Sequence, residues 1–128
     1  MNHVLYRPPV RIVLATLTFY AEEHNFILIP IPDLISIDFM YRAAIAIHEE
    51  QPIPRIVHGE ALNLIRSVRY LIRDMENSLQ LIAAINDPDE ALYQDGLRFA
   101  FRLEFVIYDQ INRWPRNPRN RRNRWNRF

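Results

Sequence analysis

Residues 61–90 read ALNLIRSVRYLIRDMENSLQLIAAINDPDE, and this stretch decides the expected fold. Its apolar residues recur at alternating spacings of four and three, the pattern of a helix that buries one seam, as in a coiled coil. The members of this seam are Ala61, Ile65, Val68, Ile72, Met75, Leu79 and Ile82. We therefore expect one long helix from about residue 59 to residue 85.

The segment that follows ends this helix and begins another. Asp87 suits an N-cap, Pro88 suits a first helical position, and Glu90 completes a capping box. The next helical pattern reaches about Arg113, and Pro115 prevents its continuation. A connection this short places two long helices antiparallel, so we expect a long C-terminal helical hairpin.

The second helix of this hairpin carries apolar side chains on two nearly opposite faces. At about 100° per residue, one face holds Leu92, Phe99, Leu103, Val106 and Ile107. The other face holds Leu97, Phe101, Phe105 and Tyr108. A helix that is apolar on two sides is either central in its domain or shared with another chain. We expect the second face to form the interface of a homodimer or higher homo-oligomer; the alternative is that the N-terminal segments cover both faces.

The N-terminal half of the chain predicts shorter elements. Pro8 and Pro9 precede apolar residues at helical spacing, but many of these residues are β-branched or aromatic, which leaves open a strand that pairs with Phe26–Ile31. Asp33 suits the N-cap of a helix that runs to about Glu50. The prolines of FILIPIP and QPIPRI favour extended connectors on both sides of that helix. We expect a mainly α fold of three or four helices; the alternative is an α+β fold with an N-terminal β-hairpin.

Composition limits the class of protein. At 128 residues, 49% of them hydrophobic, the chain is expected to form one helical domain over residues 1–114 and a basic tail over residues 115–128. The absence of cysteine excludes disulfides and thiolate metal sites, and the two glycines are too few for a glycine-rich phosphate loop. Since neither a membrane-spanning run nor a secretory signal is apparent, we expect an intracellular, cytoplasmic protein without a membrane partner, in the host cytoplasm if the source is viral.

Charge divides the chain sharply. Residues 1–112 carry nine arginines and fifteen acids, a net charge of −6, whereas residues 113–128 carry seven arginines and no acid. Lysine is absent, so every basic side chain is a guanidinium group, which can hold a phosphate through two N–H groups and can stack on a base. A tail of this kind is typical of a segment that binds an anionic partner.

Eleven residues are candidates for nucleic-acid contacts. Three arginines lie within about 60° of one another around the helix expected over residues 59–85, and they favour a ridge that follows a phosphate backbone. The tail adds further arginines with asparagine beside them, and a tryptophan that can stack on bases. The candidates are Arg66, Arg69, Arg73, Arg113, Arg116, Arg119, Arg121, Arg122, Arg124, Trp125 and Arg127. The alternative is a solvated helix face and a tail that neutralises its own acidic body.

Catalytic and metal-binding residues are not indicated. The triplets Glu22-Glu23-His24 and His48-Glu49-Glu50 offer acid–base groups. However, adjacent residues of a helix point to different sides, so neither triplet forms a site by itself. No nucleophile motif is apparent. We therefore expect a protein that is not an enzyme and that has no cofactor and no metal.

These patterns predict an RNA-binding protein. RNA is favoured over DNA because no DNA-reading motif is visible, and double-stranded RNA is favoured over single-stranded RNA. The expected architecture is generically similar to small viral helical RNA-binding proteins, which implies a suppressor of RNA silencing that sequesters double-stranded RNA, or a protein that packages RNA. No motif transfers a residue role from those proteins. The rival expectation is a structural or assembly protein whose helical body self-associates and whose tail docks on an acidic protein.

Overall fold

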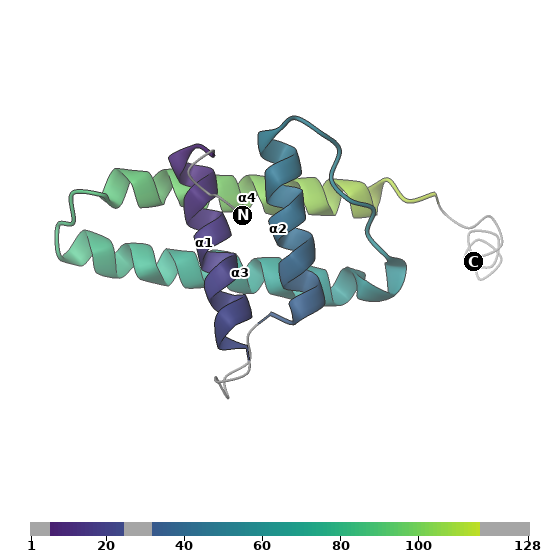
Figure 1. Cartoon of the computed structure of the whole chain (residues 1–128), viewed down its shortest axis with the longest axis horizontal. Coiled ribbons are helices and arrows are strands. Elements are labelled where there is room, and N and C mark those ends of the chain that lie inside the picture. The colour runs from purple at the N-terminus through teal and green to yellow at the C-terminus, as the bar shows by residue number, and fades with distance from the viewer. Residues whose placement is uncertain (1–5, 25–31, 116–128) are drawn as a thin grey trace, which may run out of the picture.

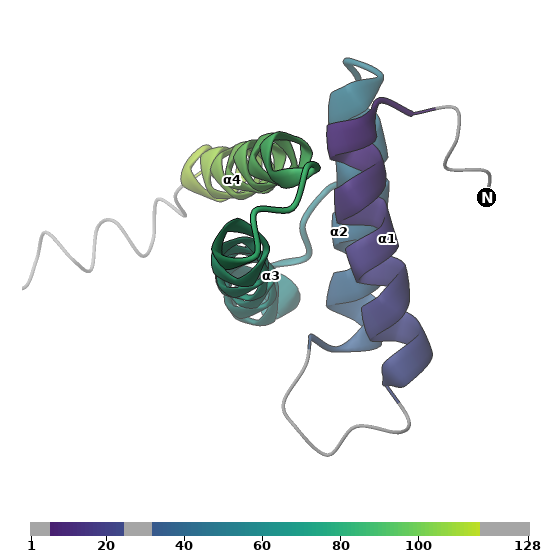
Figure 2. The ribbon, with the colours of Figure 1, turned by 90° about the vertical axis from the view of Figure 1, so that its left-hand side faces the viewer.

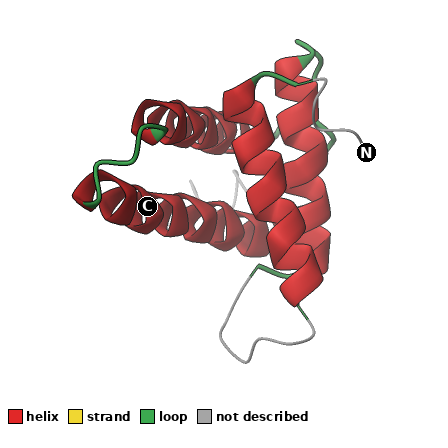
Figure 3. Ribbon diagram, turned by 60° about the vertical axis from the view of Figure 1, so that its left-hand side comes forward, coloured by secondary structure: helices red, strands yellow, loops and turns green. Residues whose placement is uncertain are grey.

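The computed structural model describes residues 6–24 and 32–115, and these residues are mainly helical. They contain four α-helices and no strand (Figure 3). The elements are α1 (Pro8–Glu23), α2 (Leu34–His48), the short 3₁₀ helix η2 (His58–Glu60), α3 (Ala61–Ala84) and α4 (Glu90–Asn112). The mainly α fold class is thus confirmed. The strand alternative for the N-terminal segment is wrong, because Pro8–Glu23 is helical; its suggested partner, Phe26–Ile31, lies outside the described residues.

The four α-helices form two layers that cross at a steep angle. Helices α3 and α4 lie antiparallel and side by side in one layer, and α1 and α2 lie across one face of them (Figure 1). Figure 2 shows the same two layers from the end of the α3–α4 pair. Within the described residues, no helix covers the opposite face of that pair.

Local sequence sets where the first two helices begin. Helix α1 starts with Pro8 and Pro9, whose missing N–H groups would have no helical partner in the first turn. The Asp33 carboxylate accepts a hydrogen bond from the N–H of Ser36 at 2.7 Å, which caps α2. Both starts agree with the signals in the sequence.

The start of α4 differs from the predicted capping box. The Asp87 carboxylate accepts a hydrogen bond from the N–H of Asp89 at 2.8 Å, which closes a turn before the helix. Helix α4 then begins at Glu90, with Asp89 at the N-cap position and no side-chain cap. Asp87 therefore stabilises the turn between α3 and α4, because its short side chain reaches a closer N–H group than the first turn of the helix offers.

The buried face of α3 is wider than the predicted seam. Of the seam residues, Ile65, Leu79 and Ile82 are only partly buried. The fully buried residues of α3 are Ala61, Leu64, Ser67, Val68, Leu71, Ile72 and Met75. A seam suits contact with one partner helix, whereas α3 contacts α4 on one side and the α1–α2 layer on another, so a broader arc of its surface is buried.

Helices α1 and α4 approach each other closely at Gly96. A β-carbon at Gly96 would lie 3.1 Å from Cγ2 of Ile12 in α1 and 3.5 Å from Cε of Met75 in α3. Glycine inside a helix costs about 1 kcal/mol relative to alanine. Here the missing side chain lets α1 pack directly against the backbone of α4.

A partly buried hydrogen bond joins α1 to α3. The Tyr20 hydroxyl donates to Oδ2 of Asp74 at 2.5 Å, and its ring meets that of Tyr70 edge-on, with centroids 5.6 Å apart. Tyr20 is 3% exposed. Burial raises the pKa of the Tyr20 hydroxyl far above its ordinary value, and the hydrogen bond to Asp74 raises this pKa further.

One side chain of α4 holds the extended linker that precedes η2. Oε1 of Gln110 accepts from the N–H of Ile56 at 2.6 Å, and Nε2 of Gln110 donates to the Pro54 carbonyl at 3.0 Å. Just beyond, the Trp114 ring packs against that of His58, with centroids 3.7 Å apart and the planes tilted by 38°. These contacts fix the end of α4 to the start of α3.

The other end of the α3–α4 pair extends past α1 (Figure 1). The fully buried residues of α3 stop at Met75, and those of α4 begin at Gly96. Beyond them, Leu81 and Ile85 are 71% and 72% exposed. Burial is therefore concentrated in the half of the pair that includes the start of α3 and the end of α4.

Substitution of Gly96 by valine is expected to destabilise the fold by about 1–3 kcal/mol, because the new side chain would overlap Ile12. Gly59 provides the matched control, since a β-carbon there meets no atom within 4 Å. Gly59→Val should change the free energy of unfolding by less than about 0.5 kcal/mol. Urea unfolding followed by circular dichroism measures both, and equal destabilisation would contradict the close approach at Gly96.

The stability of the protein is expected to fall above about pH 10. Because the chain has no lysine and no cysteine, its tyrosines are the side chains that lose protons between about pH 9 and pH 12. Burial raises the pKa of Tyr20, so the folded state keeps a proton that the unfolded state has released. The resulting stabilisation is fully present below about pH 10 and is lost as the pH rises further.

Tyr20→Phe should make this loss of stability less steep, by up to about 1.4 kcal/mol per pH unit. The variant keeps the contributions of Tyr41 and Tyr70, whose pKa values are also raised by burial. Urea unfolding at a series of pH values above 10 gives the slope for both proteins. An unchanged slope in Tyr20→Phe would contradict a protonated Tyr20 in the folded state.

Candidate nucleic-acid interface

The three arginines of the predicted ridge lie exposed on the first half of α3. From Arg66 to Arg73 the helix advances roughly 10 Å. Within residues 6–24 and 32–115, no carboxylate forms an ion pair with Arg66, Arg69 or Arg73. The ion pairs there are Arg42–Asp38, Arg98–Asp95 and Arg113–Asp109. The ridge therefore presents positive charge that no direct acidic partner neutralises.

The two acids that follow the ridge in sequence lie in different environments. Asp74 accepts the hydrogen bond from Tyr20 and is turned toward α1. Glu76 is exposed. Both carboxylates lower the positive potential near the ridge, but neither forms an ion pair with its arginines. The ridge also belongs to a helix whose other side is buried, since Val68 and Leu71 are fully covered.

Arg69 connects the ridge to α4. Its guanidinium carbon lies 5.8 Å from the centroid of the Tyr108 ring, which is a cation–π contact. The sequence assigns Arg69 to nucleic-acid binding and Tyr108 to an oligomer interface. The structure brings these two residues together on one surface.

Aromatic side chains of α4 continue this surface. Phe101, Phe105 and Tyr108 lie within about 60° of one another around α4. Phe101 is 44% exposed and Phe105 is 70% exposed, while Leu103 and Ile107, on the opposite side of the helix, are fully buried. We call this surface the outer face and define it by Arg66, Arg69, Arg73, Phe101, Phe105 and Tyr108. Leu97, the fourth residue predicted for an oligomer interface, is partly buried and packs against the core.

The predicted basic tail begins at the same half of the α3–α4 pair as the ridge. Arg113 pairs with Asp109 at 3.1 Å, and Trp114 packs against His58 of η2. The end of α4 therefore lies beside the start of α3, where the ridge is. The remaining predicted contacts lie outside the described residues: Arg116, Arg119, Arg121, Arg122, Arg124, Trp125 and Arg127.

The outer face combines two kinds of group that suit nucleic acid. Guanidinium groups donate to phosphate oxygens through two parallel N–H groups, and such contacts are strengthened by charge. Exposed aromatic rings can stack on unpaired bases. This combination of groups can bind a polyanion.

The residues that fix α4 against the start of α3, and so hold the two helices of the outer face together, could not be identified from the sequence. Gln110 reads as an ordinary polar residue of a helix, although its side chain fixes the linker before η2. The contact between the rings of Trp114 and His58 could not be predicted from the sequence either, because the two residues are far apart in the chain. Neither contact leaves a periodic or local signal, so no sequence pattern could have revealed them.

Similarity to known proteins suggests no role for the outer face. Among the described residues, no group of three or more histidines and acids is arranged to hold a metal ion. None of the helices in this part of the chain is both long and apolar enough to cross a membrane. Comparison of the whole chain with protein-family models, with curated proteins and with solved structures found no match.

Proposed function

We propose that this chain is a non-enzymatic RNA-binding protein that contacts RNA through the outer face and the arginine-rich tail. The observation that carries the proposal is the exposed row of Arg66, Arg69 and Arg73, which has no acidic partner among the described residues. A row of guanidinium groups on a packed helix suits the backbone of duplex RNA, which proteins recognise mainly by shape.

The tail supports the same proposal. Residues 116–128 contain six arginines and no acid. Because Trp114 is held beside η2, this sequence follows directly from the half of the molecule that carries the ridge. Ridge and tail would then contribute to one electrostatic footprint, and the affinity should fall steeply as salt rises. Within this proposal, the favoured use is sequestration of double-stranded RNA by a viral suppressor of RNA silencing, with packaging of RNA as the alternative.

Removal of the two ridge arginines that do not contact Tyr108 should weaken the binding of duplex RNA. We expect Arg66→Ala/Arg73→Ala to lower the affinity about tenfold at low salt. We also expect the slope of log K against log salt to decrease by about 2, because each lost phosphate contact removes roughly 0.9. Fluorescence anisotropy titrations with a labelled duplex at several salt concentrations measure both quantities.

The matched control is Arg42→Ala/Arg98→Ala, which removes the same charge from two arginines that already pair with acids of their own helices. It should change the affinity by less than about twofold. Equal losses in the two variants would show that net charge, and not the ridge, governs binding. Deletion of residues 116–128 is a further arm of the experiment, and unchanged affinity would contradict a role for the tail.

A second candidate function is assembly, which the exposed aromatics of α4 favour. Phe105 and Phe101 present apolar surface that no described residue covers fully. We infer that two copies pair through this aromatic part of the outer face. Because Arg69 packs on Tyr108, each ridge would border the interface, and the dimer would present two ridges together. If RNA does not bind, the same pairing fits a structural protein whose tail docks on an acidic protein surface.

Charged substitutions in the aromatic part should abolish self-association. We expect Phe101→Glu/Phe105→Glu to be monomeric at concentrations where the unaltered protein is dimeric, because the interface would bury four new carboxylates per dimer. The matched control is Ile35→Glu/Val57→Glu, at residues that are 63% and 67% exposed on another surface. Light scattering coupled to size-exclusion chromatography measures the mass. A monomeric unaltered protein, or a control that dissociates instead, would contradict pairing through the outer face.

A further inference from the structure

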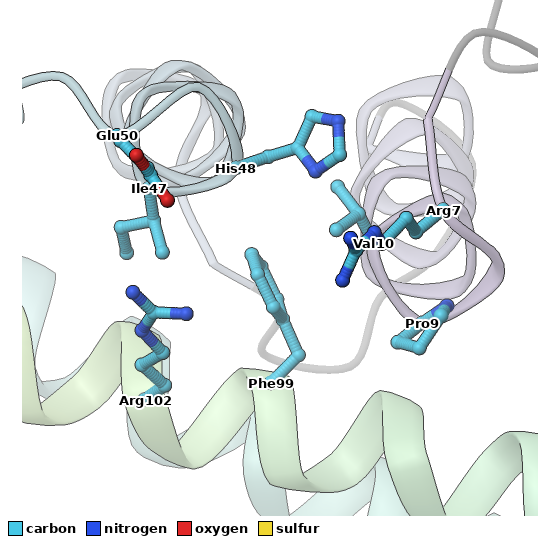
Figure 4. Close-up of a pocket in the computed structure, with 8 residues that line it drawn as sticks. All are labelled: Arg7, Pro9, Val10, Ile47, His48, Glu50, Phe99 and Arg102. Carbon is cyan, nitrogen blue, oxygen red and sulfur yellow. The ribbon is translucent and has the colours of Figure 1, made fainter.

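A pocket of about 280 Å³ lies away from the outer face, between the start of α1, the end of α2 and the middle of α4 (Figure 4). Its lining residues are Arg7, Pro9, Val10, Ile47, His48, Glu50, Phe99 and Arg102. Half of them are apolar and half are charged or polar. Small-molecule sites commonly combine an apolar floor with a few polar groups, and this volume is near the lower end of their usual range of roughly 300–1,000 Å³.

Two arginines flank the Phe99 ring in this pocket (Figure 4). Arg7 reaches in from the position before α1, and Arg102 rises from α4. Within the described residues, neither forms an ion pair with a carboxylate. Both guanidinium groups can therefore donate to an anionic group beside the Phe99 ring.

His48 and Glu50 reach the same pocket because the chain reverses after α2. The helix ends at His48, and Glu50 adopts a left-handed backbone conformation with φ of 56°. Asn86 occupies the same conformation after α3, with φ of 53°, and asparagine tolerates it better than most residues. Glutamate adopts this conformation less often than asparagine, and glycine would be favoured at this position. The N–H of Gln51 donates to the Ala46 carbonyl at 2.8 Å, so this left-handed residue ends the helix, and the side chain of Glu50 lines the pocket.

The imidazole of His48, which lines the same pocket, is held by a contact with an aromatic ring. Its ring meets that of Tyr6 edge-on, with centroids 5.2 Å apart, and it extends from α2 toward α1 (Figure 4). The pocket thus offers two free guanidinium groups, a flat apolar surface, an imidazole and a single carboxylate. These groups select for a ligand that is anionic, partly flat, and able to donate hydrogen bonds.

We propose that this pocket binds a nucleoside monophosphate group. The phosphate accepts hydrogen bonds from Arg7 and Arg102, the base lies against Phe99, and a hydroxyl or amino group of the ligand donates to Glu50. Inorganic phosphate would leave the apolar floor without a contact, and an uncharged nucleoside would leave both guanidinium groups unpaired. The ligand is either a free mononucleotide or the phosphorylated end of an RNA strand, which present the same chemistry. The inference is independent of the outer face, which consists of other residues.

The test is calorimetric titration of the full chain with adenosine monophosphate, adenosine and inorganic phosphate. We expect the monophosphate to saturate one site and the other two probes to bind at least about tenfold more weakly. Arg102→Ala and Arg7→Ala should each weaken the monophosphate about tenfold. The matched control is Arg98→Ala, one turn earlier on α4 and not part of the pocket lining, which should leave the affinity unchanged.

Two outcomes would overturn the proposal. The first is no saturable binding of the monophosphate. The second is an affinity that Arg102→Ala leaves unchanged, or that Arg98→Ala lowers equally, because the ligand would then be held elsewhere, for example by the basic tail. Glu50→Gly separates a binding role from a structural one: it should raise the urea midpoint, since glycine suits the left-handed backbone, while it weakens the monophosphate. A variant that gains stability and keeps full affinity counts against the role of Glu50 and against the ligand as proposed.

A final comparison distinguishes the two sources of the ligand. One short single-stranded RNA is titrated with a 5′-phosphate and with a 5′-hydroxyl group. Tighter binding of the phosphorylated strand, lost in Arg102→Ala, assigns the site to a strand end; equal binding assigns it to the free mononucleotide. The titration with adenosine monophosphate involves no RNA strand, so its failure is distinguishable from failure of RNA binding at the outer face.

Discussion

The contact between Ile12 of α1 and the backbone of α4 at Gly96 sets the distance between the two helical layers. A β-carbon at Gly96 would already require Ile12 to shift, and larger side chains would require a larger shift of α1. At the observed distance, Tyr20 of α1 reaches Asp74 of α3, and the buried residues of both layers form one hydrophobic core. One close approach thus determines the packing of α1 against both helices of the pair.

This packing is one-sided, and the outer face is its direct consequence. Both N-terminal helices lie on the same side of α3 and α4, so the opposite side has no helix of the described chain against it. Phe101 and Phe105 consequently stay in contact with solvent. Arg69 of α3 contacts the ring of Tyr108 of α4, so the cationic row and the aromatic row form one surface. The arginine row of α3 or the aromatic row of α4, taken alone, would not differ from an ordinary solvent-exposed helix face.

Most of the secondary structure could be predicted from the sequence, because its signals are local. Asp33 and the proline pair mark helix starts, and apolar periodicity places α3 and α4 within a few residues of their observed bounds. The coiled-coil seam was too narrow a description of α3. Leu64 and Leu71 are buried because α3 contacts more than one helix. The spacing of apolar residues along a helix does not show how many other helices pack against it.

The candidate sites show a similar division between local and non-local information. Exposure of the ridge arginines follows from helical phase alone, whereas the meeting of Arg69 with Tyr108 depends on how two helices pair. His48 and Glu50 point to different sides in a regular helix, and only the left-handed backbone at Glu50 brings both to one pocket. A left-handed backbone is unusual for glutamate, so the sequence gives no reason to expect it at this position.

The uneven burial along the α3–α4 pair has a consequence for motion. Segments with few buried contacts open locally at a small free-energy cost, whereas a well-buried segment opens only with the whole fold. The end that carries Leu81 and Ile85 belongs to the first kind, and the end held by Gln110 and Trp114 belongs to the second. The ridge arginines lie on the well-buried half, so the backbone that carries them is already ordered before a partner binds. Local unfolding of the end that carries Leu81 and Ile85 can therefore occur without disturbing the helical segment that carries the ridge arginines.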